Sequence, residues 1–433
     1  MTSERLLFVG ARVVDPASGT DGVRDVLVVD GEIAGPDVPA EGAERIDCDG
    51  LVLAPGLVDL HAHLREPGFE HKETVETGSR AAAVGGFTAV AAMANTDPVT
   101  DHAAIVHEVR DLAAAYGLCD VFPVGAVTKD RAGESLAEIG EMVEAGVRVF
   151  SDDGDTVSTA RLLRNALTYA KAFPVEVAIA DHAEDPTLVE GGHMHEGAAS
   201  YAMGVAGRPA AAEEIVVARD LAVARATGGR LHLCHLSTAV AVEQVRRAKA
   251  EGIRVTAEVT PHHLTFTDDD LRAYDTNLKM HPPLRTAEDR EALRGGLADG
   301  TIDVVATDHA PHAVEEKEVE FDHALPGTIG LETALAAVLT ELVAPGRLTL
   351  TRAIEALATT PARILGAVDH GGPIAPGRPA NLVLFDPRES WVVEPPFASK
   401  ARNSAFLGRR LQGRVRMTVL RGERTAIDAK AAR

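Results

Sequence analysis

Short strand-like runs alternate with helical stretches through the middle of this chain, and this alternation limits its fold more than any other feature. Eight apolar, β-rich runs cover residues 57–63, 88–93, 121–126, 147–151, 175–181, 231–235, 254–259 and 303–307. Helical stretches rich in Ala, Leu and Glu follow at 75–84, 103–116, 134–145, 159–172, 211–227, 239–251, 287–298 and 331–343. Eight β-α units in about 300 residues predict an α/β fold, a closed parallel (β/α)8 TIM barrel. An open doubly wound sheet is the alternative, but it would carry a glycine-rich phosphate loop after its first strand, where this chain has His61-Ala62-His63.

The two ends of the chain have a different pattern from its middle. Residues 1–55 contain β-rich runs separated by Asp-Pro and Asp-Gly turns, and residues 366–433 contain runs of the same kind. Neither end has enough strands to form a stable sheet alone. We therefore predict one composite small β-domain, a β-sandwich built from residues 1–55 and 366–433, beside a barrel domain of residues 56–365.

Charge and cysteine content exclude several classes of protein. The formal net charge of −22 argues against a nucleic-acid partner, because phosphate binding needs clustered Lys and Arg. Cys48, Cys119 and Cys234 are too few for a disulfide framework. The first residues form no apolar signal region, and the longest apolar stretch, 81–94, is too short to span a bilayer. We expect a cytoplasmic protein that binds neither nucleic acid nor membranes.

Five of the eight strand-like runs end in, or are directly followed by, histidine or aspartate. The two histidines of the first run share a face, because alternate residues of a strand point the same way. The other four runs end in or are followed by Asp152-Asp153, His182, His235 and Asp308. The carboxyl ends of barrel strands meet at one rim, and these side chains are the ligand types of Zn²⁺ and related divalent ions. The set predicts a metal site at that rim.

Two aspartates need individual interpretation. Alternation places Asp153 on the face with the small and branched side chains and Asp152 on the face with Phe150, which favours Asp153 as the ligand. Asp308 precedes Pro311 by three residues, which makes a helix cap a poor explanation for it. A carboxylate in that position can take a proton from metal-bound water and return it to a leaving nitrogen.

Two further polar residues follow the first two strand-like runs. Arg65 can hold a substrate carboxylate through two hydrogen bonds, and a surface ion pair with Glu66 is the alternative. Asn95 offers both an amide donor and an acceptor, although a residue that only forms a turn would fit the same position.

Taken together, these motifs resemble the dihydroorotase family of the cyclic amidohydrolases, in its class I bacterial type. The similar segments are residues 59–68, 93–96, 150–154, 256–263 and 306–312. The resemblance implies a zinc-dependent barrel enzyme that interconverts N-carbamoyl-L-aspartate and L-dihydroorotate in pyrimidine biosynthesis, with metal-bound hydroxide as the nucleophile.

The resemblance also implies roles for individual residues. One metal would be bound by His61 and His63 and bound or bridged by Asp153, and a second by His182 and His235, so we expect one or two Zn²⁺ ions per chain. Asp308 would be a metal ligand and the general acid and base. The substrate contacts that it implies are His63, Arg65, Asn95, His281, His312, Pro326 and Gly327. His281 departs from the family pattern, which has Asn before the double proline.

Two other functions are compatible with parts of this pattern. Hydantoinases and allantoinases carry a carboxylated Lys at the position of Asp153, and residues 149–154 contain no Lys. A non-catalytic, dihydroorotase-like partner of aspartate transcarbamoylase would lack metal ligands, and here all are present. A homodimer and a complex with an aspartate transcarbamoylase are the assemblies that the sequence leaves open.

Overall fold

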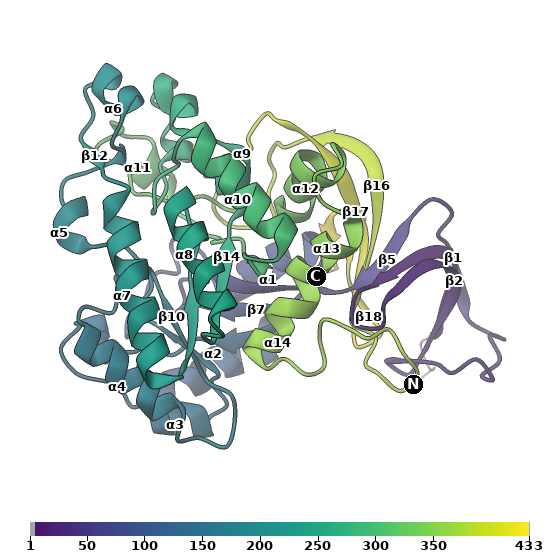
Figure 1. Cartoon of the computed structure of the whole chain (residues 1–433). Helices are drawn as coiled ribbons and strands as arrows, with labels where there is room; N and C mark the ends of the chain where they lie inside the picture. Colours follow the sequence, from purple (N-terminus) through teal and green to yellow (C-terminus); the bar gives the residue numbers. More distant parts are fainter. Residues whose placement is uncertain (1–4, 433) are drawn as a thin grey trace.

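Eight parallel strands form a barrel in the middle of the chain, in a computed structural model that describes residues 5–432 (Figure 1). The barrel strands are β6 (Leu57–Ala62), β7 (Phe87–Ala92), β8 (Asp120–Pro123), β9 (Val149–Ser151), β10 (Ala178–Asp181), β13 (Arg230–Leu233), β14 (Val255–Val259) and β15 (Val304–Val305). They pair as β6-β7-β8 and β9-β10-β13-β14-β15. Parallel bridges from Gly125 to Phe150 and from Ala62 to His309 join the two groups and close the ring. The predicted (β/α)8 barrel is confirmed.

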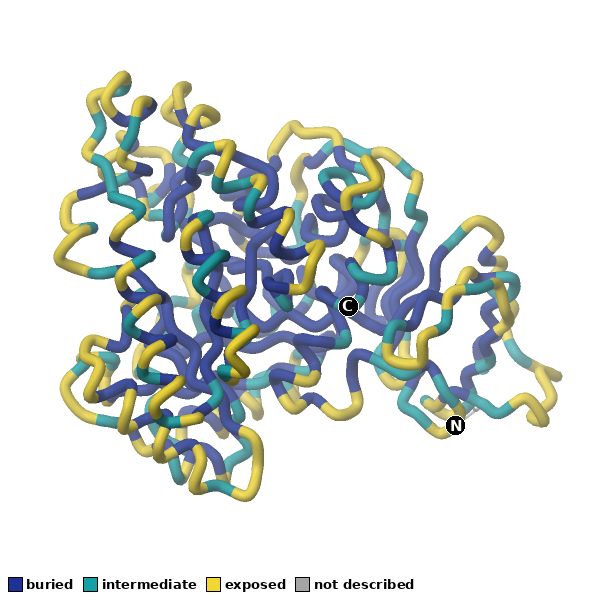
Figure 2. The backbone as a smooth tube through the Cα atoms, viewed as in Figure 1, coloured by how far each residue is buried: buried dark blue, intermediate teal, exposed yellow. Residues whose placement is uncertain are grey.

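Helices surround the barrel and bury one face against it (Figure 2). In α4, Leu163 and Leu167 are buried at helical spacing, and the side chain of Thr159 caps the first turn by accepting from Leu162 N. The helices of the ring are α1 (Val75–Val84), α2 (Ala103–Tyr116), α3 (Ile139–Glu144), α4 (Ala160–Ala170), α7 (Ala211–Thr227), α8 (Ala239–Ala250), α10 (Ala287–Asp299), and α12 (Ala334–Val338) with the π-helical turn η4 (Leu339–Val343). Three helical segments complete the barrel part, α13 (Leu350–Ile354), η5 (Glu355–Thr359) and α14 (Thr360–Leu365).

Excursions from the barrel lie between strands and helices. They contain η1 (Lys129–Arg131), α5 (Pro186–Val189), β11 (Met194–His195), α6 (Ala198–Met203), β12 (Gly207–Arg208), α9 (Pro261–Thr265), η2 (Asp268–Ala273), η3 (Thr276–Leu278) and α11 (Val314–Lys317). No helix within residues 5–432 is both long and apolar enough to cross a lipid bilayer.

The predicted helix over 134–145 is wrong in its first half, because α3 begins only at Ile139. The segment before α3 pairs instead with residues 127–129. Lys129 N donates to the Ser135 carbonyl at 3.0 Å, and Ala137 N donates to the Val127 carbonyl at 3.0 Å. These bonds use backbone groups that a helix over this segment would have paired within itself.

Both ends of the chain enter one nine-stranded mixed sheet, which lies to the right of the barrel in Figure 1. Its strands run in the order β19-β18-β17-β16-β5-β1-β2-β3, with β4 paired to β1. The two ends meet where β16 pairs antiparallel with β5. The strands are β1 (Arg5–Asp15), β2 (Thr20–Val29), β3 (Glu32–Ile33), β4 (Glu44–Asp47), β5 (Val52–Pro55), β16 (Leu382–Val392), β17 (Arg410–Leu420), β18 (Glu423–Ile427) and β19 (Lys430–Ala431).

Alternate residues of β16 serve two different cores. Val383 and Phe385 pack into the barrel core, whereas Leu382 and Leu384 pack into a separate cluster of the small sheet. Leu53 of β5 also belongs to that second cluster. The period of two residues in a strand thus lets one sheet cover its own core and dock onto the barrel.

Candidate metal centre and substrate site

The six residues predicted as metal ligands meet at the rim formed by the carboxyl ends of the barrel strands. They are His61 in β6 and His63 directly after it, Asp153 after β9, His182 after β10, His235 after β13 and Asp308 after β15. All six are buried. His235 and Asp308 have positive φ angles of 29° and 44°. Such backbone is costly for residues other than glycine and recurs at functional sites.

The Asp153 carboxylate lies between two pairs of histidines. Its Oδ2 is 3.3 Å from Nε2 of His61 and 3.4 Å from Nε2 of His63. Its Oδ1 is 3.2 Å from Nε2 of His235 and 3.7 Å from Nδ1 of His182. Although burial opposes ionisation, the neighbouring histidines, His61 above all, hold the pKa of Asp153 well below its usual range.

Asp308 approaches the first histidine pair from the neighbouring strand, because the segment after β15 pairs with the end of β6. Its Oδ1 is 3.1 Å from Nε2 of His63 and 3.6 Å from Nε2 of His61. Against the effect of burial, a hydrogen bond from His63 and the charge of His61 lower the pKa of the Asp308 carboxyl. The carboxylate is therefore available as a proton acceptor at neutral pH.

Asp152 is engaged elsewhere. Both of its carboxylate oxygens accept hydrogen bonds from residues 127–128, including one of 2.6 Å from the Thr128 hydroxyl. The geometry agrees with the choice of Asp153 from strand alternation.

Sequence reasoning missed Glu258, which fixes the orientation of His61. Oε1 of Glu258 lies 2.7 Å from Nδ1 of His61, and Oε2 lies 3.0 Å from Nε2 of His232. With Nδ1–H donated to Glu258, the lone pair of His61 Nε2 points to the centre of the cluster. This buried Nε2 has no hydrogen-bond partner among the described residues. The signal in the sequence was a glutamate inside an otherwise uncharged strand.

His281, expected at the substrate, stands beside the second histidine pair. Its Nε2 is 3.1 Å from Nε2 of His182 and 2.9 Å from Oε2 of Glu184. Glu184 was also missed, although it follows His182 by two residues. Its carboxylate, in turn, is 3.3 Å from the guanidinium groups of both Arg208 and Arg285. A cavity of about 280 Å³ is bordered by His182, Glu184 and His281.

The other expected substrate residues lie around the first histidine pair and the loop after β15. Oδ1 of Asn95 is 2.8 Å from Nδ1 of His63. Nε of Arg65 donates to the Pro311 carbonyl at 3.3 Å, and Nε2 of His312 lies 2.8 Å from the Pro326 carbonyl. Gly327 has a φ of 132°, and a Cβ there would lie 3.1 Å from His312 Nε2.

Arg65 does not form the surface ion pair with Glu66 that was the alternative. Glu66 accepts from Val75 N at 2.8 Å, and within residues 5–432 no carboxylate forms an ion pair with Arg65. Burial lowers the pKa of Arg65 to about 10, so its guanidinium is still charged at neutral pH.

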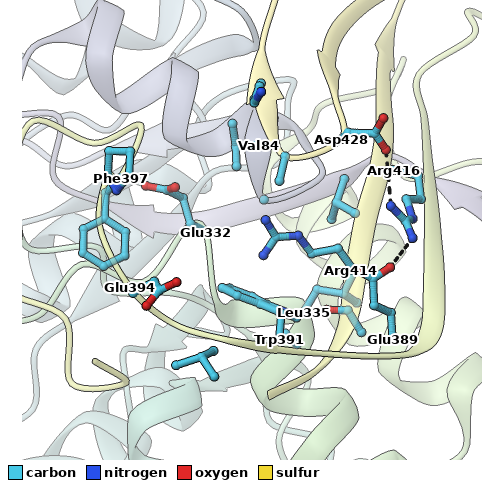
Figure 3. Close-up of a pocket in the computed structure, with 18 of the residues that line it drawn as sticks. Val84, Glu332, Leu335, Glu389, Trp391, Glu394, Phe397, Arg414, Arg416 and Asp428 are labelled. Carbon is cyan, nitrogen blue, oxygen red and sulfur yellow. Dashed lines mark hydrogen bonds and ion pairs between the residues drawn. The ribbon is translucent and has the colours of Figure 1, made fainter. Parts of the chain in front are cut away.

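A larger cavity lies away from this rim, between α1, α12 and the strands β16, β17 and β19. It has a volume of about 540 Å³, and Figure 3 shows Arg414 and Glu332 facing it near Trp391. The Arg414 guanidinium stacks on the Trp391 ring at 4.3 Å. None of the residues predicted for the site lines this cavity.

Comparisons with known proteins agree on one family. A family model described as Dihydro-orotase-like matches residues 50–241, and one described as Amidohydrolase family matches residues 203–426. The dihydroorotase of Pelotomaculum thermopropionicum is 51% identical over 96% of this chain and 97% of its own. That of Streptomyces coelicolor is 52% identical over 94% of this chain and 96% of its own.

The fold has counterparts among solved structures. An L-hydantoinase (dihydropyrimidinase) from Arthrobacter aurescens matches with a TM-score of 0.87 and 27% sequence identity, covering 99% of this chain and 97% of the hydantoinase. The barrel and the composite sheet are therefore both parts of a known architecture.

Proposed function

Since this chain belongs to the dihydroorotase family of the amidohydrolases, we propose that its buried histidine and aspartate cluster is the metal centre of a dihydroorotase. The enzyme interconverts N-carbamoyl-L-aspartate and L-dihydroorotate. The observation that carries the proposal is the Asp153 carboxylate, whose two oxygens each face a different pair of histidines.

The donor set suits zinc. Imidazole nitrogens and carboxylate oxygens are its ordinary ligands. Nε2 of His61 is buried without a hydrogen-bond partner among the described residues, and a bound cation would satisfy it. His61 and His63 would hold one Zn²⁺, and His182 and His235 a second. Asp153 would bridge them, because its oxygens diverge towards the two pairs. Asp308 would complete the first set.

The chain's own residues supply proton transfer. A bound zinc ion supplies polarisation of the scissile carbonyl and lowers the pKa of water. In the hydrolytic direction, Asp308 accepts a proton from the attacking water and passes it to the departing ring nitrogen. In the cyclising direction, Asp308 takes the proton of the ureido nitrogen as the ring closes and returns it to the oxygen that leaves as water.

The substrate carboxylate that does not react needs a separate anchor. Arg65 offers a charged guanidinium without a carboxylate partner among the described residues. Asn95, His281 and His312 would add hydrogen bonds, with the backbone at Pro326 and Gly327. Fixing this carboxylate holds the reacting amide in place over Asp308 and the metal, which is a large source of rate enhancement.

Hydantoinase or allantoinase activity is the alternative within the amidohydrolases. The absence of a lysine from residues 149–154 disfavours it. The test is a comparison of dihydroorotate, hydantoin and allantoin as substrates of the same zinc-quantified protein. We expect turnover of dihydroorotate to exceed the other two by at least about a hundredfold in kcat/KM. Preference for hydantoin or allantoin would contradict the proposal.

Location and assembly follow from the same proposal. We place the reaction in the cytoplasm and expect a homodimer, with an aspartate transcarbamoylase as the candidate protein partner. A non-catalytic scaffold is disfavoured because its defining feature, missing ligands, is not seen at this rim. Sizing of the purified protein, alone and mixed with the transcarbamoylase of the same source, tests both assemblies.

A further inference from the structure

The side chain of Asn403 reaches the barrel rim from the segment that connects β16 and β17 of the small sheet. Asn403 is buried, with 5% of its surface exposed. Its Oδ1 accepts from the backbone N–H of His312 at 3.1 Å. Its Nδ2 donates to the carbonyls of Ala310 at 3.0 Å and Gly327 at 3.1 Å. The carboxamide thus uses both of its donors and its acceptor on two loops of the substrate site.

The backbone of Asn403 reinforces the same connection. Its carbonyl accepts from Ile329 N at 3.0 Å and from the Thr328 hydroxyl at 3.0 Å. One residue therefore ties the loop that follows Asp308 to residues 327–329. These are two of the segments from which substrate contacts are expected.

The two loops are packed closely enough for small displacements to matter. A Cβ at Gly327 would lie 2.8 Å from the Cβ of Ala310. The buried Lys317 ammonium also donates to the carbonyls of Leu325 at 2.8 Å and Gly327 at 3.1 Å. The Gly327 carbonyl is thus held by two donors, Lys317 and Asn403.

We propose that Asn403 is a positioning residue for substrate binding. It holds the His312 backbone and Gly327 close together, so this side of the site is already formed before substrate binds. The free-energy cost of ordering the two loops on binding is therefore smaller. The proposal rests on the proposed function, because it concerns the same substrate site. In this proposal the carboxyl-terminal part of the chain contributes directly to the shape of the substrate site at the barrel rim.

Three substitutions test it in the full-length, zinc-loaded protein. Asn403→Ala removes all three side-chain hydrogen bonds. Asn403→Asp keeps the acceptor for His312 N but places an oxygen against the carbonyls of Ala310 and Gly327. Asn403→Ser retains one small polar group and should recover part of the function. We expect KM for dihydroorotate to rise about tenfold in Asn403→Ala and Asn403→Asp, and to rise less in Asn403→Ser. In all three variants kcat should stay within about threefold of wild type, and zinc content should be unchanged.

Asn381 provides a matched control. It is also buried, and its side chain donates to the Asp369 carbonyl at 2.9 Å and accepts from Arg421 N at 2.7 Å. These partners belong to the small sheet and its connections, away from the rim. Asn381→Ala should lower the thermal midpoint to a similar extent as Asn403→Ala but leave KM within about twofold of wild type.

The outcomes separate the two proposals. A wild-type protein that contains zinc but does not turn over dihydroorotate would overturn the proposed function. With an active wild type, an unchanged KM in the soluble Asn403 variants, or an equal rise in Asn381→Ala, would overturn the positioning role alone. If Asn403→Ala is insoluble, the KM values of Asn403→Asp and Asn403→Ser are compared with that of Asn381→Ala instead, and the same two results would overturn the positioning role.

Discussion

At the scale of single residues, the rim is organised by pairs in which one side chain orients another. Glu258 takes the Nδ1–H of His61, and Asn95 faces Nδ1 of His63, so the Nε2 atoms of both histidines turn towards the same carboxylates. A ligand that is held in this way loses less conformational entropy when a cation binds. In the proposed metal centre, metal affinity would therefore depend also on side chains that orient the ligands without contacting the ion.

Glu258→Gln tests this dependence. The amide has nearly the same shape but lacks the charge that accepts from both His61 and His232. We expect zinc affinity to fall about 10- to 100-fold, measured by competition with a chromogenic chelator. Glu243→Gln, on the exposed face of α8, is the control and should leave affinity unchanged. Equal affinity in wild type and Glu258→Gln would argue against the orienting role.

Asp308→Asn tests the proton transfer. An asparagine cannot accept the proton, so kcat should fall by about 10²- to 10⁴-fold while zinc content is retained through the histidines. Asp155→Asn, an exposed residue paired with Arg131, should have nearly full activity. Retention of near wild-type turnover in Asp308→Asn would remove Asp308 from its proposed role.

Much of this residue pattern is readable from the sequence, and the limits have a physical cause. His182 and Asp308 could be placed at one rim because each follows a strand-like run, and His61 because it lies near the end of one. Strand alternation separates Asp153 from Asp152. Glu258 leaves one local signal, a charged residue within a strand, but its partner His61 belongs to a different strand and becomes its neighbour only after folding. Asn403 has no local signature, because its partners at the rim lie far away in the sequence.

At the scale of elements, the small sheet and the barrel depend on each other through β16. One face of this strand completes the barrel core and the other completes the core of the sheet. The composite sheet was predictable, because neither end of the chain had enough strands alone. The error over residues 134–145 arose because backbone hydrogen bonds to residues 127–129 hold residues 135–137 outside a helix, and such contacts override local helix propensity.

Deletion of residues 370–433 tests this dependence. It removes β16, the partner of β5, and exposes Val52 and Leu53 on the remaining edge. We propose that residues 1–55 and 366–433 form one folding unit beside the barrel of residues 56–365. The shortened chain should therefore be insoluble or lose its cooperative thermal transition, followed by circular dichroism. A soluble, fully cooperative product would contradict this division.

An ion pair also links the two parts. Asp120, at the start of β8, accepts from His370 Nε2 at 2.9 Å and from both terminal nitrogens of Arg421 at 2.6 and 2.8 Å. Burial opposes ionisation, but these hydrogen bonds lower the pKa of Asp120 to about 2. Because the folded pKa lies below the unfolded one, the stabilisation is present at neutral pH and is lost as pH falls towards 2.

Asp120→Asn should therefore lower the free energy of unfolding by about 2 kcal/mol at neutral pH, measured in urea. The difference from wild type should shrink to roughly half near pH 3. Asp21→Asn, which breaks an exposed pair with Arg12, should cost less than about 1 kcal/mol. A difference for Asp120→Asn that does not change with pH would contradict the ion-pair account.

At the scale of the whole molecule, the candidate site and the contacts with the small sheet lie at opposite ends of the barrel strands. The carboxyl ends carry the histidines and aspartates, and residues of the opposite ends, such as Asp120, dock the small sheet. The carboxyl-terminal segment departs from this division around Asn403, where it returns to the rim. The family comparisons and the cluster geometry both fit an enzyme with a metal cofactor, and we propose that its activity requires the metal.

Zinc titration of the chelator-treated protein tests that claim most directly. Activity with dihydroorotate is measured at each step, together with bound zinc per chain. The account predicts negligible activity without metal and a rise that saturates at one or two zinc ions per chain. Full activity in protein shown to be free of metal, or stoichiometric zinc binding without any turnover of dihydroorotate, would contradict it.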